Sequence, residues 1–133
     1  MNMQADIAAA VRPHWERLRP LIQKAVKFSP GMTEEQLLAG VLDRRYGFFP
    51  AEKAFVFACI EDIAANMFLA GGDHQEVARL EPEILAWAKV HKVRRIRTEV
   101  RLGVEKTDEQ HGHFKALGYR RARIVYEKDI PDV

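Results

Sequence analysis

The residues of this sequence that could take part in acid–base chemistry are few and widely spaced. Glu61 and Glu99 are carboxylates that could accept a proton from a substrate, as could one of the histidines. Tyr119 and Tyr126 are phenols near the C-terminus that could donate one. The spacing of these groups selects none of them, so Glu61, Glu99 and Tyr119 remain open as candidate catalytic residues.

The histidines and the single cysteine do not form a metal-binding pattern. His111 and His113 would point to opposite sides of a helix, which suits chelation of one ion poorly. His74 and His91 stand apart, without a cysteine or carboxylate pattern beside them. Cys59 excludes an internal disulfide and has the apolar neighbours of a packing residue. We therefore expect neither a metal site nor a cysteine nucleophile.

Arginines gather on two predicted strands and could form an interaction patch. On each strand they share one face by their even spacing. They are Arg95, Arg97 and Arg101 on residues 94–101, and Arg121 and Arg123 on residues 119–128. If the strands are neighbours, such a patch could hold a nucleic-acid backbone or an acidic protein surface. Alternatively, Glu99 and Glu127 neutralise it, and no interleaved aromatic residues favour single-stranded nucleic acid.

Length and composition predict one domain over residues 1–133. The chain has 47% hydrophobic and 30% charged residues, and its net charge of +2 does not by itself require a nucleic-acid partner. No apolar run reaches the ~20 residues that span a bilayer, and residues 1–10 lack the pattern of a signal peptide. We expect cytoplasmic synthesis and no membrane partner.

Hydrophobic periodicity predicts two helices at the start of the chain. The first covers residues 14–27, with Trp15 on its apolar stripe, Pro13 at its first position and a kink at Pro20. The second follows Thr33, which forms a capping box with Gln36, and is predicted to extend to Arg45.

A meander of strands and a β/α half are predicted to follow. Three strands are expected at residues 46–49, 53–61 and 66–70. Asp73 is expected to cap a turn of helix over residues 75–80, after which a main helix takes Pro82 in its first turn and carries Trp87 on its apolar stripe. Strands at 94–101 and 119–128 flank a helix over 105–117 that ends at Gly118. The fold class is therefore α/β (α+β), in the order ααβββαβαβ.

This element order resembles the acyl-CoA N-acyltransferase (GNAT) superfamily over nearly the whole chain. The most specific local piece is residues 113–119, His-Phe-Lys-Ala-Leu-Gly-Tyr, which looks like the closing helix of the family and its glycine stop. The resemblance implies a central, mixed, mostly antiparallel sheet with helices on both faces. It also implies that the two arginine-bearing strands are neighbours and that Trp15 and Trp87 lie in the core on opposite faces.

More narrowly, the chain is similar to short GNAT-like proteins encoded in the structural-gene regions of tailed bacteriophages and prophages. Three passages carry this likeness: residues 68–72, Phe-Leu-Ala-Gly-Gly; residues 80–88, Leu-Glu-Pro-Glu-Ile-Leu-Ala-Trp-Ala; and residues 101–103, Arg-Leu-Gly. Val104 stands where such proteins commonly have an aromatic residue. The likeness implies phage structural proteins as partners and a place in the host cytoplasm or the virion.

The resemblance also implies which residues an active enzyme would need, and two of these are replaced. Gly71 and Gly72 stand where the family binds the CoA pyrophosphate, but a Gly-x-Gly pattern is absent and Asp73 and Glu76 bring negative charge. Phe114 stands where the family has a tyrosine that protonates the CoA thiolate.

Three functions follow from these replacements. The favoured one is a catalytically degenerate GNAT-fold protein, with no cofactor, that acts through protein contacts in particle assembly. The alternatives are an active N-acetyltransferase that uses acetyl-CoA, and a nucleic-acid-associated accessory protein. Element order cannot decide among them, because function lies in sites that are grafted on folds.

Overall fold

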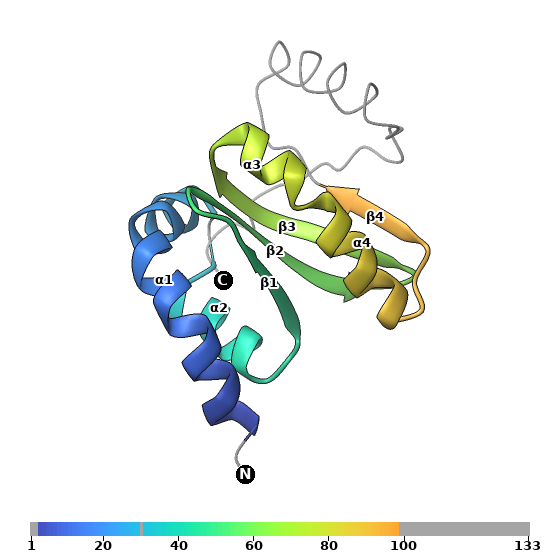
Figure 1. Ribbon diagram of the computed structural model, residues 1–133, viewed down its shortest axis with the longest axis horizontal. Helices are drawn as coiled ribbons and strands as arrows, with labels where there is room; N and C mark the ends of the chain where they lie inside the picture. Colours follow the sequence, from blue (N-terminus) through green and yellow to red (C-terminus); the bar gives the residue numbers. More distant parts are fainter. Residues whose placement is uncertain (1–2, 30, 99–133) are drawn as a thin grey trace, which may run out of the picture. The chain divides into compact units, whose positions relative to one another are not determined.

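The computed structural model describes residues 3–29 and 31–98, which build a four-stranded sheet with helices on both faces (Figure 1). The elements are α1 (Met3–Lys27), α2 (Glu34–Leu42), β1 (Tyr46–Pro50), β2 (Ala54–Glu61), β3 (Ala64–Gly72), α3 (His74–Arg79), α4 (Glu81–Val90) and β4 (Arg95–Thr98). None of the described helices is long and apolar enough to cross a membrane. The predicted order is confirmed through β4, and the helix and strand expected after it lie outside the described residues, as does part of the predicted single domain.

The sheet is mixed and mostly antiparallel, as expected, with the strand order β1-β2-β3-β4. The pairs β1–β2 and β2–β3 are antiparallel, whereas β4 lies parallel to β3. The register of β2 against β3 shifts after Phe57, which pairs with Leu69 while Ala58 pairs with Met67. This bulge lets Phe68 and Leu69, two successive residues, pack against the same hydrophobic cluster.

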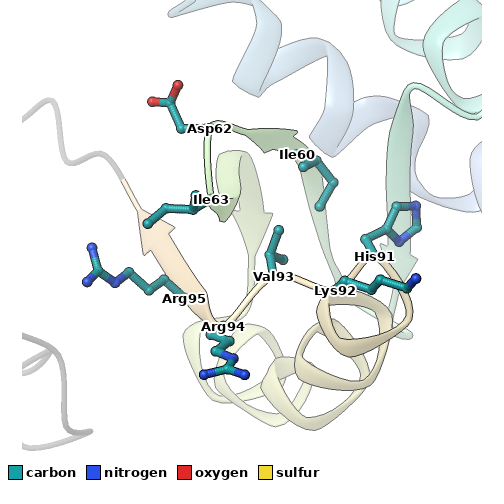
Figure 2. Close-up of a pocket in the computed structure, with 8 residues that line it drawn as sticks. All are labelled: Ile60, Asp62, Ile63, His91, Lys92, Val93, Arg94 and Arg95. Carbon is teal, nitrogen blue, oxygen red and sulfur yellow. The ribbon is translucent and has the colours of Figure 1, made fainter.

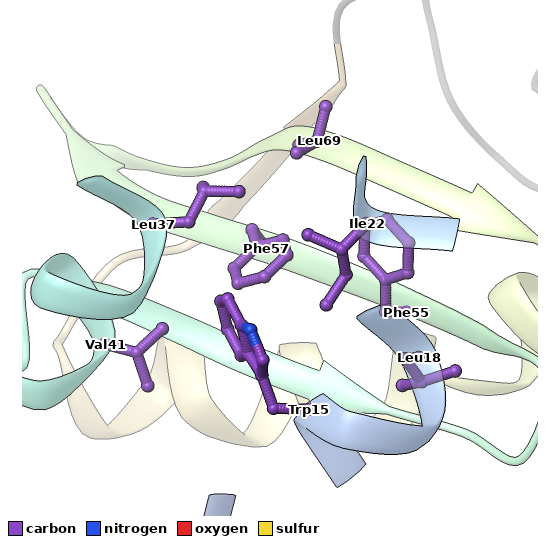
Figure 3. Close-up of a cluster of buried hydrophobic side chains, with 8 residues drawn as sticks. All are labelled: Trp15, Leu18, Ile22, Leu37, Val41, Phe55, Phe57 and Leu69. Atoms are coloured by element: carbon purple, nitrogen blue, oxygen red, sulfur yellow. The ribbon is translucent and has the colours of Figure 1, made fainter. Parts of the chain in front are cut away.

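One face of the sheet packs against α1 and α2 through a cluster of aromatic and aliphatic side chains (Figure 3). Trp15 lies at its centre, with its ring 5.4 Å from that of Phe48 and 5.6 Å from that of Phe57. Leu18 and Ile22 follow Trp15 along α1 at helical spacing and are fully buried. This stripe explains why α1 forms and which face of it is buried.

A polar cluster around Glu34 fastens α2 to α1 at the edge of this core. The Trp15 indole Nε1 donates a hydrogen bond to Glu34 Oε1 over 3.0 Å, and Arg19 Nε donates to the same oxygen over 2.7 Å. Gln23 Nε2 donates to the other carboxylate oxygen over 3.4 Å. Burial alone would raise the pKa of Glu34, but these hydrogen bonds and the Arg19 charge lower it below its ordinary value.

The opposite face of the sheet packs against α3 and α4. Leu80 and Ile84 are buried with Phe49, Val56 and Ala58 in a second cluster. Pro82 occupies the start of α4, where its missing N–H breaks no helical hydrogen bond, so the predicted division into a short and a main helix is confirmed. Trp87 packs against this cluster with its ring 5.6 Å from that of Phe49, but it is only partly buried. The two tryptophans therefore lie on opposite faces, as expected.

Two predicted helix boundaries were wrong. The first helix begins at Met3 rather than His14, because Ile7 and Val11 continue its apolar stripe onto the core, and Pro13 lies inside it. The second helix ends at Leu42 rather than Arg45. It ends there because Arg44 takes a left-handed conformation and the Asp43 carboxylate accepts hydrogen bonds from Arg45, which ends the helical backbone pattern.

We expect the Glu34→Gln variant to lose about 1 kcal/mol of stability at pH 7, since a charged acceptor is replaced by a neutral one. The folded pKa of Glu34 is lowered, so its stabilisation is present above the ordinary value of 4.5 and is lost as the pH falls through the lower folded value. Urea unfolding at pH 7 and pH 3 should show the difference between wild type and variant shrinking in acid. A difference that is constant with pH would contradict this account.

Truncation of Trp15 should be the more damaging of the two tryptophan changes. Trp15 is only 3% exposed and its indole N–H is satisfied by Glu34, so Trp15→Ala should cost ~3–5 kcal/mol in the free energy of unfolding. Trp87→Ala removes a partly buried ring and should cost roughly half as much. Denaturant unfolding of both variants measures the two costs, and an equal cost would mean that Trp87 is as enclosed as Trp15.

Candidate functional site

The carboxyl end of β3 carries the two glycines that the sequence predicts as cofactor-binding residues. Gly71 lies under the ring of Phe55, and a Cβ on Gly71 would come within 2.9 Å of Phe55 Cε1. Gly72 has a φ of +97°, and a Cβ there would overlap the carbonyl oxygen of Lys53 and lie 2.6 Å from the Cα of Ala54. Both glycines are therefore required by packing of β3 against β2, without any ligand.

The start of α3 is closed by its own carboxylate. Asp73 Oδ1 accepts hydrogen bonds from the backbone N–H groups of Gln75 and Glu76, over 2.9 and 3.1 Å. The cap that the sequence predicts at Asp73 is thus confirmed. These N–H groups are the donors that a phosphate would use at a helix N-terminus, so the Asp73 carboxylate takes the place of an anion.

The second acidic residue of this turn is also engaged. Glu76 Oε1 accepts a hydrogen bond from the backbone N–H of Lys53 over 3.0 Å, and the Lys53 carbonyl accepts one from the Asp73 N–H over 3.0 Å. Both backbone polar groups of Lys53 are therefore bonded to the start of α3. The described residues do not fit a CoA pyrophosphate in this arrangement, since Asp73 already accepts from the amides of Gln75 and Glu76, and Glu76 adds a second negative charge.

The other end of β3 carries a second polar group that contains Glu61, a candidate catalytic residue. Glu61 is exposed, and its Oε2 accepts a hydrogen bond from Asn66 Nδ2 over 3.1 Å. Asn66 is only 5% exposed, and its Oδ1 has no hydrogen-bond partner. The Glu61 carboxylate is accessible as a proton acceptor, and Asn66 fixes its position.

Arg97 lies directly across from Asn66 in the β3–β4 pairing. Its Nη1 is buried without a hydrogen-bond partner and lies 3.7 Å from Asp62 Oδ2, an ion-pair distance. Arg95 and Arg97 alternate with Ile96, which packs against the second cluster, so the two arginines share one face of the described part of β4. Arg95 is exposed, whereas the Arg97 side chain is only 25% exposed.

The structure separates the sequence-predicted residues rather than gathering them. Glu61 pairs with Ala64 at one end of the β2–β3 ladder, and Gly72 lies at the other, roughly 26 Å along the strand at a rise of about 3.3 Å per residue. Cys59 is partly buried on β2. Between residues 3 and 98, residue 30 aside, no three metal-binding side chains gather. The remaining candidates, Glu99, Tyr119, Arg101, Arg121 and Arg123, as well as Phe114, lie outside the described residues.

Sequence reasoning missed Asn66 and Asp62 as members of a polar group. The available signal for Asn66 was a lone carboxamide within the apolar segment Ala64–Leu69. Asp62 gave no sequence signal beyond being a turn residue, and its left-handed φ of 56° is of the kind that Asp tolerates better than most residues.

The comparisons with known proteins find fold neighbours only. The aminoglycoside N-acetyltransferase AAC(6')-Iy in complex with CoA matches with a TM-score of 0.61 and 16% identity, over 89% of this chain and 90% of that one. The same enzyme in complex with the bisubstrate analogue CoA-S-monomethyl-acetylneamine matches with a TM-score of 0.58 and 16% identity, over 89% and 92%. No protein-family model and no curated protein matches the sequence. At this identity the likeness shows the fold, which is that of the GNAT N-acetyltransferases.

Substitutions at the corner where β3 meets α3 should measure how much its packing and its helix cap contribute to the free energy of unfolding. We expect Gly72→Ala to cost at least ~2 kcal/mol of stability, because the methyl group meets the Lys53 backbone and the residue must keep a positive φ. Asp73→Ala should cost about 1 kcal/mol through loss of the cap. Thermal and urea unfolding measure both, and a Gly72→Ala variant as stable as wild type would show that the corner can open.

Proposed function

We propose that this chain is a non-catalytic protein with the GNAT fold, which acts through contacts with other proteins rather than by acyl transfer. The observation that carries the proposal is the hydrogen bonding of Asp73, whose carboxylate accepts from the first free amides of α3. A dianionic pyrophosphate placed there would have to displace a covalently tethered carboxylate and lie close to a second one, Glu76.

The fit of the glycines supports the same proposal. In a nucleotide-binding turn, a glycine lets the backbone approach the phosphates. Gly71 and Gly72 instead make room for Phe55 and for the Lys53 backbone, so the absence of their side chains is explained by the protein's own packing. Nothing about these two positions requires a ligand.

An acyl-CoA N-acyltransferase is the second candidate, and it is consistent with the fold neighbours. Both neighbours are described as complexes with CoA or a CoA-containing analogue. In such an enzyme, acetyl-CoA would be the cofactor and Glu61 an accessible proton acceptor. That enzyme would need to hold the pyrophosphate with groups other than the amides that follow Asp73.

The partner class follows from the sequence resemblance to short phage and prophage proteins. We propose a phage structural protein as the partner, in the host cytoplasm or in the particle. A nucleic-acid role for the arginine face of β4 is a weaker proposal, since Arg97 is largely covered and lies at ion-pair distance from Asp62.

Calorimetric titration of acetyl-CoA into the purified chain tests the proposal. We expect no binding, or a dissociation constant weaker than about 100 µM, which corresponds to a small binding free energy for so large a ligand. The Asp73→Asn/Glu76→Gln variant, which removes both negative charges, should not gain tight binding, because the packing of Gly72 on Lys53 is unchanged. A low-micromolar constant for the wild type would overturn the proposal and favour the enzyme.

A further inference from the structure

A shallow depression of about 510 Å³ lies at the amino end of β3 and β4, away from the glycine corner (Figure 2). The end of β2, the β2–β3 turn and the segment that joins α4 to β4 form it. Its lining residues are Ile60, Asp62, Ile63, His91, Lys92, Val93, Arg94 and Arg95. Figure 2 shows Ile60, Ile63 and Val93 around the middle, with Arg94 and Arg95 extending from the rim.

The rim of this depression has an excess of positive charge. Lys92, Arg94 and Arg95 are cationic at neutral pH, and Asp62 is the acidic residue among those lining it. The Asp62 carboxylate is partly compensated by Arg97, which lies 3.7 Å from it and is not part of the lining. A ligand in the depression therefore meets a field that favours negative charge.

The backbone at Lys92 presents one of these cations at a conformational cost. The Val93 N–H donates to the Ala88 carbonyl and the Lys92 N–H to the Lys89 carbonyl, which is the Schellman pattern of a helix C-terminus. Glycine is the usual residue at the left-handed position of this motif, but Lys92 occupies it with a φ of 61°. Asp62, across the depression, is also left-handed. Lys92 therefore keeps a backbone conformation that costs it more free energy than it would cost glycine.

One exposed aliphatic side chain lies in the depression, and another is next in sequence to a lining residue. Ile63 is 58% exposed within the depression, and Val90, next to the lining residue His91, is 77% exposed. Both belong to the small set of large hydrophobic side chains that the described part of the chain leaves open to solvent. Aliphatic side chains beside a cationic rim suit a protein segment better than a nucleic acid, which would use aromatic surfaces for its bases.

We propose that this depression docks an acidic segment of a partner protein, one that carries an aliphatic side chain among its carboxylates. The aliphatic side chain packs on Ile63 and Val93, and the carboxylates pair with Lys92, Arg94 and Arg95. The site rests on the proposed contact function for its biological role, but its binding is independent of CoA, since it lies at the opposite end of β3 from Gly72. It extends the predicted interaction patch from the strand face to the α4–β4 connection.

Fluorescence anisotropy with three labelled probes tests this docking site on the full chain. The probes are the peptide Glu-Glu-Leu-Glu-Ile-Glu, the same peptide with Ser in place of Leu and Ile, and a 12-nucleotide oligothymidylate. The aliphatic acidic peptide should bind at least about 3-fold more tightly than the serine peptide, because a Leu or Ile side chain can pack on Ile63 and Val93 whereas Ser cannot. Its binding should weaken as salt rises from about 50 to 300 mM, because the charged rim is exposed.

Matched variants locate the binding. The Arg94→Glu/Arg95→Glu variant should bind the aliphatic peptide at least about 10-fold more weakly than wild type does. The Ile63→Ser variant should bind it about 3-fold more weakly. The control Lys24→Glu/Lys27→Glu makes the same change of net charge at exposed positions of α1 and should leave affinity within about 2-fold. Circular dichroism melting checks that each variant is folded, and an unfolded Arg94/Arg95 double variant is replaced by Arg94→Gln, with a loss of about 3-fold expected.

Four results would overturn the proposal. They are no binding of the aliphatic peptide up to about 1 mM, equal binding of the serine peptide, preference for the oligothymidylate, and equal loss in the α1 control. Acetyl-CoA titration of the same samples keeps the two proposals apart. Tight CoA binding together with peptide docking would overturn only the non-catalytic function, and absence of both would overturn only the docking site.

Discussion

Both backbone polar groups of Lys53 are bonded to the turn between β3 and α3, and much of the structure depends on this clamp. The Lys53 N–H donates to Glu76, and its carbonyl accepts from the Asp73 N–H. The clamp brings the backbone of Gly72 so close to β2 that no side chain fits there. It thereby fixes where α3 begins and which amides Asp73 caps. At the same turn, the Asp73 carboxylate occupies the amides of Gln75 and Glu76, on which an anion-binding site would rely.

The parallel pairing of β3 with β4 gives the described unit two chemically different ends. At the carboxyl end of β3, the corner is acidic and internally satisfied through Asp73 and Glu76. At the amino end, the segment that joins α4 to β4 places basic residues beside the β2–β3 turn, where Ile63 is exposed. A strand of nine residues separates these ends, so a ligand at one has no direct contact with the other.

Some polar side chains of this fold hydrogen-bond one helix or strand to another, in addition to those that only face solvent. Glu34 gathers donors from three successive turns of α1, and it satisfies the indole of Trp15 at the centre of the core. Asn66 lies at the start of β3 with one amide atom bonded to Glu61 and the other without a partner. Such a half-satisfied buried amide costs free energy unless a further group completes its hydrogen bonding.

The sequence by itself determined the elements, because local signals define them. The Thr33–Gln36 capping box, the Asp73 cap, Pro82 at a helix start and the strand alternation around Ile96 are all encoded within a few residues, and each is found where it was expected. The start of α1 was missed because Pro13 suggested a boundary, whereas burial of Ile7 and Val11 against distant strands extends the helix through it. Only the tertiary structure decided what the functional residues do. That Gly72 makes room for the Lys53 backbone, that Arg97 lies beside Asp62, and that Lys92, Arg94 and Ile63 line one depression all depend on strand pairing and on the path of the chain from α4 to β4. No local sequence pattern records such contacts.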